Sequence, residues 1–165
     1  ETIKKINKKS LKCNLYVSAS VQEEMGLRGA RIINSNVNPD FSIALEGTVS
    51  NDLPGVPAHK KLAQLGNGPE IRISDKYLIA DRSFNNYLQD TANKKKINFQ
   101  LTAKNAGGTN ATAFQVTGKG SKATVLSVPV RYLYSPSSVC LIKDVASTIK
   151  LLTAGILNIQ KFKDE

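Results

Sequence analysis

The chain has 165 residues, of which 41% are hydrophobic and 22% charged, so we expect residues 1–165 to form one domain with a single core. No stretch approaches the ~20 consecutive apolar residues that a membrane span requires, which excludes a membrane protein and a membrane partner. The net charge of +10 suggests nucleic acid as a partner. However, no ribonucleoprotein-type motif and no Cys/His finger spacing is present, so nucleic-acid binding is the least favoured function.

Three separated basic runs account for much of the charge. They cover residues 4–12 (KKINKKSLK), 93–98 (NKKKIN) and 159–163 (IQKFK). Each run is typical of a solvated turn of an amphipathic helix, and nothing in the sequence joins them into one motif. The chain starts at Glu1 without an initiator Met, and its first residues resemble the end of a helix. We therefore expect a fragment of a longer protein.

Two strands are predicted on either side of an acidic motif. Residues 14–21 (NLYVSASV) are rich in β-branched residues and are bounded by polar residues, which favours a strand. This run leads directly into SVQEEMGLRGARI, which contains Glu23 and Glu24. A second strand is predicted over residues 40–49 (DFSIALEGTV), and Glu46 lies inside it.

The rest of the chain alternates short strands with helices. Residues 47–69 are rich in Gly, Pro, Asn and Asp and indicate a long loop, which in compact domains is commonly functional. Further strands are predicted at 69–74, 98–104 and 123–133, the last of them buried on both faces. Helices are predicted at 83–96, at 143–162 with Asp144 as the N-cap, and as a short helix capped by Thr109.

This alternation predicts an α/β fold with helices on both faces of a sheet. In such sheets ligands bind at the carboxyl ends of strands. Three polar features occupy such positions: the Glu23/Glu24 pair, Glu46, and Tyr134 with Ser135. The strand ends therefore predict the location of the functional site.

The two cysteines give information about the compartment. Cys13 and Cys140 are far apart in sequence, each in an apolar setting and without CxxC spacing. This pattern favours buried free thiols in a reducing compartment, the cytoplasm, with a single disulfide as the alternative.

The carboxylates need a partner or a turn to act together. Neighbouring side chains on a strand point to opposite faces, so Glu23 and Glu24 converge only if the chain turns, which Gly26 and Gly29 favour. Glu46 lies in an apolar run, and a buried carboxylate costs several kcal/mol unless it is paired or bound to a metal. A metal site and a salt bridge to one of the arginines Arg28, Arg31 and Arg131 are equally weighted alternatives.

Five segments, in order, carry a resemblance to a known family: VQEEMGLRGA, FSIALEGTVSNDLPG, HKKLAQLGNGPEIRISD, GGTNATAFQVTGKG and SVPVRYLYSPSSV. Together they resemble the C-terminal part of the catalytic domain of the tetrahedral co-catalytic metallo-aminopeptidases. This family includes glutamyl and deblocking aminopeptidases, and some members are labelled endoglucanase. The resemblance covers residues 16 to 154 and implies an incomplete three-layer α/β sandwich with a mixed sheet, of phosphorylase/hydrolase-like type.

The resemblance also implies an activity and roles for residues. It implies a hydrolase that removes N-terminal residues from peptides with water activated by two divalent metals, zinc or cobalt. Glu23 is then the general base, and Glu24 and Glu46 are metal ligands. This chemistry is sound, because two metals ~3.5–4 Å apart clamp the attacking and developing oxygens, and a neighbouring carboxylate can act as acid and base.

The sequence departs from the family pattern at several points. Tyr134 stands where the family has a His, and a phenol with a reference pKa near ~10 is a poor ligand at pH 7. Asn110 replaces an acid of the family's GGTDAG segment. The upstream segment with a first His and a bridging Asp is absent, as is the inserted β-domain, and His59 matches a loop His. We therefore expect weak or no metal binding and little or no activity.

Three functions are compatible with the sequence. The first is a metallo-aminopeptidase with an incomplete site, and the second is a non-catalytic aminopeptidase-like binding or assembly subunit. The third is a basic nucleic-acid-binding domain. A missing upstream half predicts an exposed sheet edge and self-association into a homo-oligomer.

Overall fold

A mixed four-stranded sheet forms the centre of the computed structural model, which describes residues 1–164. The strand order is β1-β4-β2-β3. β1 pairs with β4 in parallel, β2 pairs with β3 in parallel, and β2 and β4 are antiparallel. The strands are β1 Phe41–Val49, β2 Glu70–Ser74, β3 Gln100–Ala103 and β4 Lys122–Val130. Each coincides with a predicted strand, and the mixed sheet confirms the expected fold class.

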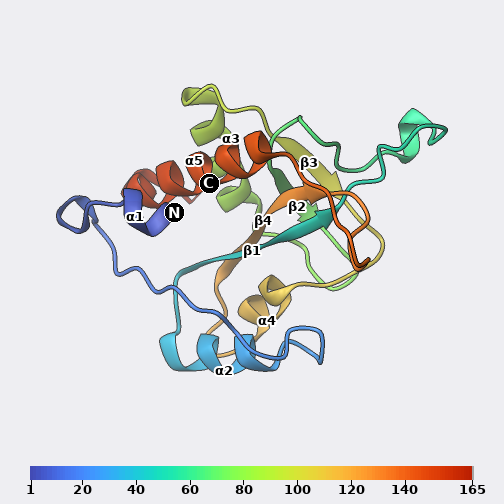
Figure 1. Ribbon diagram of the computed structural model, residues 1–165. Helices are drawn as coiled ribbons and strands as arrows, with labels where there is room; N and C mark the ends of the chain where they lie inside the picture. The colour runs from blue at the N-terminus through green and yellow to red at the C-terminus, as the bar shows by residue number, and fades with distance from the viewer. Residues whose placement is uncertain (165) are drawn as a thin grey trace.

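The helices are named as in Figure 1. The α-helices are α1 Thr2–Lys5, α2 Arg28–Val37, α3 Arg82–Lys94, α4 Asn110–Val116 and α5 Ile142–Leu157. Three short 3₁₀ helices are η1 Lys8–Ser10, η2 Ala58–Lys60 and η3 Ile159–Lys161. α3, α4 and α5 confirm the predicted helices. No helix among residues 1–164 has both the length and the apolar character needed to cross a bilayer.

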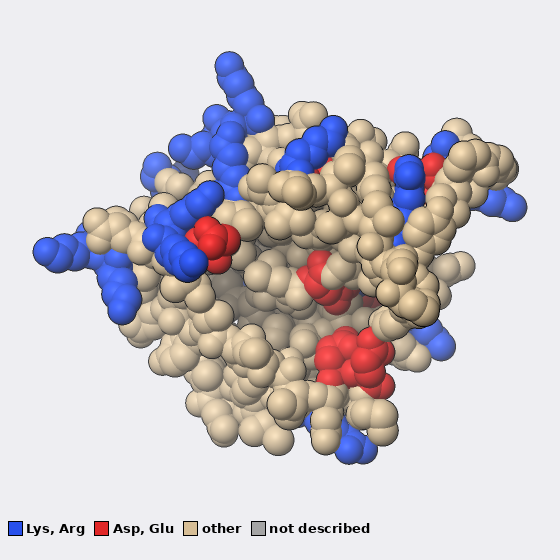
Figure 2. Space-filling view, viewed as in Figure 1, with Lys and Arg blue, Asp and Glu red and all other residues tan. Residues whose placement is uncertain are grey.

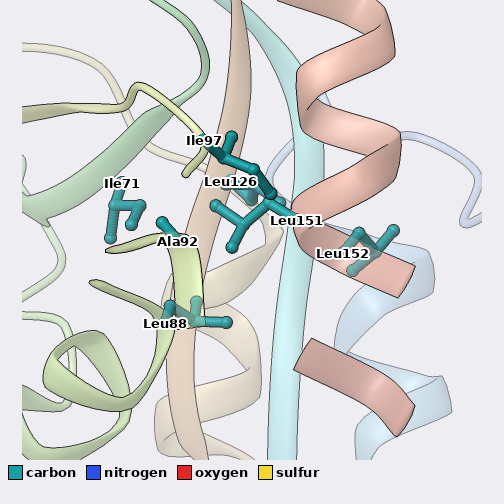
Figure 3. Packing of buried hydrophobic residues seen from close by; sticks show 7 residues of the cluster. All are labelled: Ile71, Leu88, Ala92, Ile97, Leu126, Leu151 and Leu152. Carbon is teal, nitrogen blue, oxygen red and sulfur yellow. The ribbon is translucent and has the colours of Figure 1, made fainter. Parts of the chain in front are cut away.

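The helices form layers on both faces of the sheet (Figure 1). α3 and α5 lie on one face and pack around a core that Figure 3 shows from close by. This core contains Ile71, Leu88, Ala92, Ile97, Leu126, Leu151 and Leu152. On the other face α4 covers a second cluster of Ala44, Leu78, Ala80, Ala111, Ala123 and Val125, and α2 packs against α4. Val125 and Leu126 are neighbours on β4 and serve opposite faces, as the strand period of two requires. The three-layer arrangement is confirmed.

The predicted strand at residues 14–21 is wrong. This segment is extended but forms no ladder, and Tyr16 and Val17 are each 66% exposed. Its β-branched residues fit a strand, but β-propensity acts only where a neighbouring strand supplies hydrogen bonds and packing. The helix α2 was not predicted, because its apolar positions are interrupted by glycine and asparagine.

Asp144 is not the N-cap of α5, which begins after Leu141. Its buried carboxylate accepts hydrogen bonds from the backbone N–H groups of Gly66 (2.6 Å) and Gly68 (3.0 Å). Asp144 therefore ties the long loop to α5. The Thr109 cap of α4 is confirmed, since its hydroxyl accepts from the N–H of Ala111 at 3.1 Å.

The thiols of Cys13 and Cys140 are free but exposed, so the expectation of burial is wrong. Cys13 lies in the segment that forms no ladder, and Cys140 lies in the connection before α5. Neither flanking apolar run becomes part of the core clusters. The sequence pattern therefore predicted the free state of both thiols but not their place in the fold.

Candidate functional site

A tight turn presents Glu23 and Glu24. The carbonyl of Glu23 accepts hydrogen bonds from the N–H groups of Gly26 (3.2 Å) and Leu27 (2.9 Å). Gly26 and Leu27 both have positive φ, and the αL conformation costs a non-glycine residue about 1–2 kcal/mol. The predicted turn is present, and such local strain is characteristic of functional sites.

Gly29 allows the turn to close against the preceding segment. Its N–H donates to the carbonyl of Val21 at 3.0 Å. A Cβ at this position would lie 2.6 Å from the backbone nitrogen of Val21, which is too close for any other residue. The glycine therefore fixes the start of α2 beneath the carboxylates.

Tyr134 lies beside the carboxylate pair, although it is far away in sequence. Its hydroxyl donates a hydrogen bond to Glu24, and this bond, with a smaller effect of burial, raises the pKa of Tyr134 to about 12. Tyr134 also has a positive φ of 64° and is 81% exposed. The fold thus brings together two of the three polar features predicted at strand ends, the Glu23/Glu24 pair and Tyr134. The contact is made by a tyrosine with a strained backbone conformation.

Glu23 is half-buried, and Glu24 is exposed. Partial burial raises the pKa of Glu23, and the negative charge of Glu24 raises it further. A carboxylate whose proton affinity is raised in this way is better suited to accept a proton than an ordinary surface glutamate.

Glu46 forms a salt bridge, but with a residue that was not predicted. The guanidinium of Arg72 on β2 lies 2.8 Å from its carboxylate. Arg28, Arg31 and Arg131 are not its partners: Arg131, for example, pairs with Asp52 at 2.6 Å. The sequence did not predict this role of Arg72. In the alternating segment PEIRIS the arginine occupies a polar position, which is typical of solvent exposure, but its side chain is only 4% exposed.

Arg72 is the centre of a buried charge network. It also pairs with Glu70 (3.1 Å) and Asp75 (3.3 Å), and the ammonium of Lys104 reaches Glu70 at 3.1 Å. Burial opposes the ionisation of Glu70, but Arg72 and Lys104 hold its pKa below the ordinary value. Two cations therefore neutralise much of the charge of the three carboxylates Glu46, Glu70 and Asp75.

Burial dominates the behaviour of Glu46. It raises the pKa of this carboxyl to about 7, and the opposite charge of Arg72 offsets the effect only in part. The negative charge of Glu46 also acts on Tyr134. The carboxylates Glu24, Glu23 and Glu46 all contribute to the raised pKa of this tyrosine. The charges of the three predicted acidic residues therefore act on the same phenol.

The charged side chains are distributed unevenly over the surface. Figure 2 shows Asp and Glu side chains on one side of a hollowed area, over the sheet and near α2. Most Lys and Arg side chains in this view lie on the periphery. The face with the candidate site is therefore acidic although the chain has a net charge of +10.

The residues present do not fit a pair of metal ions. Among residues 1–164, no group of three or more His, Cys, Asp and Glu side chains comes together in a way that could hold a metal. Glu24 is engaged by the hydroxyl of Tyr134, and Glu46 by the guanidinium of Arg72. Zinc sites need at least three protein ligands, so this donor set is too small and already partly occupied.

Two further residues were singled out from the sequence. His59 is exposed in η2, on the long loop. Asn110 donates from its amide to the hydroxyl of Ser20 at 2.9 Å, which connects the start of α4 to the acidic motif. Its amide oxygen is buried and has no hydrogen-bond partner within the described part of the chain. Asn110 thus has a structural contact with the site.

The layered mixed sheet and the acidic turn define an α/β protein with carboxylates gathered on one face. The family model of the M42 glutamyl aminopeptidases matches residues 1–151, and the chain belongs to this family. The resemblance found in the sequence is therefore confirmed. Members of the family are aminopeptidases, that is, hydrolases that act on peptides.

Three relatives illustrate the match. The lysyl aminopeptidase of Pyrococcus furiosus is 34% identical over 142 residues, which are 86% of this chain and 40% of that protein. An aminopeptidase structure from Desulfurococcus kamchatkensis superposes with a TM-score of 0.83 at 34% identity, over 89% of this chain and 43% of the other. A TET peptidase of Pyrococcus horikoshii, which assembles into a tetrahedron or an octahedral shell, gives a TM-score of 0.70 at 31% identity and 83% and 39% coverage. The chain thus spans about two-fifths of the length of these relatives.

Proposed function

We propose that this chain carries the carboxylate part of an aminopeptidase site and that its 165 residues alone have little or no peptidase activity. In this proposal they form one α/β domain, the C-terminal portion of a catalytic domain. The reaction of the complete site is the removal of N-terminal residues from peptides, in the cytoplasm. Membership of the M42 family supports the activity class. The occupation of Glu24 by Tyr134 and of Glu46 by Arg72 supports the low activity.

Each predicted site residue has a role in this proposal. Glu23 is the proton acceptor, which agrees with its raised pKa and partial burial. Glu24 and Glu46 stand at metal-ligand positions, and Tyr134 stands at a degenerate ligand position. In a complete site two zinc or cobalt ions would supply Lewis-acid activation of water. Residues 1–164 bring together no donor set that could hold them, so in this proposal they only position a proton acceptor beside an acidic surface.

The Arg72–Glu46 ion pair favours a second candidate function, a non-catalytic aminopeptidase-like binding or assembly subunit. A half-buried carboxylate that is already paired with an internal guanidinium has less need of a metal. Assembly is consistent with the related TET peptidase, which forms shells. A homo-oligomer of this chain remains part of the proposal.

Calorimetric titration of the chain with zinc and with cobalt tests the low metal affinity. The expected result is weak binding or none, and tight stoichiometric binding of two zinc ions would overturn it. Tyr134→His serves as a matched variant, because an imidazole beside Glu24 adds a good zinc ligand. The variant is expected to bind zinc measurably more tightly than Tyr134→Phe, which adds no ligand.

An assay against a panel of aminoacyl substrates, with zinc and with cobalt, tests the activity. The expected rates are at or near the uncatalysed level. If the chain turns over substrates at rates usual for enzymes, the low-activity proposal is wrong, and loss of that turnover in Glu23→Gln would then identify the general base.

A further inference from the structure

The second basic run and the third, which are separate in sequence, meet in the structure. Lys94 and Lys95 at the end of α3 and Lys161 and Lys163 near the C-terminus line one open groove of about 600 Å³. Lys150 on α5 adds to the same end, because its ammonium lies 3.4 Å from the carbonyl of Lys95. Figure 2 shows basic side chains along the upper rim, where α3 and α5 lie in Figure 1.

The groove runs along one face of α3. Its lining residues from this helix, Ser83 to Lys94, recur at spacings of three and four, which places them in a single row. At a rise of 1.5 Å per residue this row is about 16 Å long. The groove is therefore long enough for several linked anionic groups rather than for a single ion.

Among residues 1–164, few charges oppose the lysines. Asp90 is the acidic residue in the lining. Asp164, next to Lys163, is neutralised by the ammonium of Lys122 at 2.8 Å. The four lining lysines therefore keep most of their positive field, which is not cancelled by ion pairs within the described residues.

The other lining groups are mainly polar. Tyr87 is the aromatic member, but its ring already packs on Phe84 (6.2 Å between centroids) and on Phe162 (6.0 Å). Its hydroxyl donates to the carbonyl of Gly155 at 2.6 Å. The ring is thus packed against the protein and is poorly placed to stack on a base.

We propose that this groove binds a chain of phosphate groups, either the backbone of a single-stranded nucleic acid or an inorganic polyphosphate. Lysine ammonium groups on flexible stems suit phosphates as point charges, without selecting a geometry or a base. The binding is therefore independent of sequence and is dominated by counterion release. The groove lies on α3 and the C-terminal segment, so this proposal is independent of the carboxylate site.

Fluorescence anisotropy of a labelled oligothymidylate, with inorganic polyphosphate as competitor, tests the proposal. With four lysines engaged, the logarithm of affinity is expected to fall with the logarithm of salt concentration with a slope of about −3. The double variant Lys94→Glu/Lys161→Glu is expected to bind more than about tenfold more weakly. Polyphosphate that displaces the oligonucleotide supports the shared phosphate chemistry. Binding of only one probe also supports it and identifies the source.

The control is Lys60→Glu/Lys76→Glu, which changes the net charge equally at exposed positions outside the groove. It is expected to bind nearly as well as the unmodified chain, with unfolding curves confirming that both variants fold. Equal losses in the two double variants overturn the proposal, because they indicate a response to net charge alone. A salt slope near zero, or no binding of either probe at low salt, overturns it too.

Discussion

The guanidinium of Arg72 lies 2.8 Å from the carboxylate of Glu46, although the two residues come from strands that are not neighbours in the sheet. Arg72 also holds Glu70 and Asp75. An internal cation therefore already pairs with Glu46, the residue proposed to stand at a metal-ligand position. This relationship connects the stability of the sheet to the low metal affinity proposed for the site.

Arg72→Met should destabilise the fold strongly. The substitution keeps much of the side-chain volume but leaves buried carboxylates without their cation. Removing one partner of a buried pair costs about 3–5 kcal/mol. Urea unfolding followed by circular dichroism measures the loss. In the control, Lys119→Met removes an exposed pair with Asp40 and should cost less than about 1 kcal/mol. Similar losses in the two variants would show that the Arg72 network contributes little.

The Tyr134–Glu24 hydrogen bond predicts late titration of a tyrosine. The pKa values of Tyr134 and Tyr87 are both raised to about 12, so two of the five tyrosines should ionise last in a spectrophotometric titration. Tyr134→Phe should leave one late tyrosine, and Glu24→Gln should return Tyr134 toward its ordinary pKa.

The same pKa shift has a consequence for stability. The neutral phenol is favoured in the folded state, so the contribution is complete below the unfolded pKa of about 10 and is lost as pH rises through about 12. Stability that falls equally steeply in Tyr134→Phe over this range would contradict the contribution of Tyr134.

Much of the fold follows from local patterns. The alternation in residues 69–74 and the apolar run in 123–133 predict β2 and β4, because strands that bury one or both faces must show these patterns. Residues 14–21 show a similar pattern, but no strand pairs with them among the described residues. Local propensity carries no information about whether a partner is present.

In the candidate site, too, some features follow from local sequence and others depend on the tertiary fold. The Glu23/Glu24 turn follows from Gly26 and Gly29, and the need of Glu46 for a partner follows from its apolar setting. Its actual partner, Arg72, depends on the order of the strands, which the sequence leaves open. The meeting of Tyr134 with Glu24 depends on a residue with positive φ, which favours glycine rather than tyrosine and leaves no signal.

Asp144 should anchor the long loop to α5. Its buried carboxylate accepts from the N–H groups of Gly66 and Gly68. Asp144→Ala leaves these donors without their acceptor, so a loss of about 1–3 kcal/mol is expected. Hydrogen exchange should show faster exchange at both glycines, while amides in β4 report only global stability. Unchanged protection at Gly66 and Gly68 would contradict the anchor.

Asp52 should make stability depend on acid pH. Hydrogen bonds from Arg131 (2.6 Å) and Ser50 (2.8 Å) hold the pKa of Asp52 well below its usual range. A depressed folded pKa gives stability that is complete above the unfolded pKa of about 4 and is lost as pH falls through the folded value. Urea midpoints measured from neutral pH downward should fall more steeply in the unmodified chain than in Asp52→Asn. Parallel curves would rule out this contribution.

The free edge of β1 should promote self-association. β1 is at the end of the sheet, its ladder is formed with β4, and Leu45 and Val49 are 56% and 47% exposed. An edge with apolar side chains is a template for pairing with another chain. Sedimentation velocity should show concentration-dependent oligomers, which Leu45→Lys should reduce because a charge at the edge opposes pairing. Ile142→Lys is the matched control, since Ile142 is 87% exposed but belongs to α5. If Ile142→Lys reduces association as much as Leu45→Lys, the edge of β1 is not the contact.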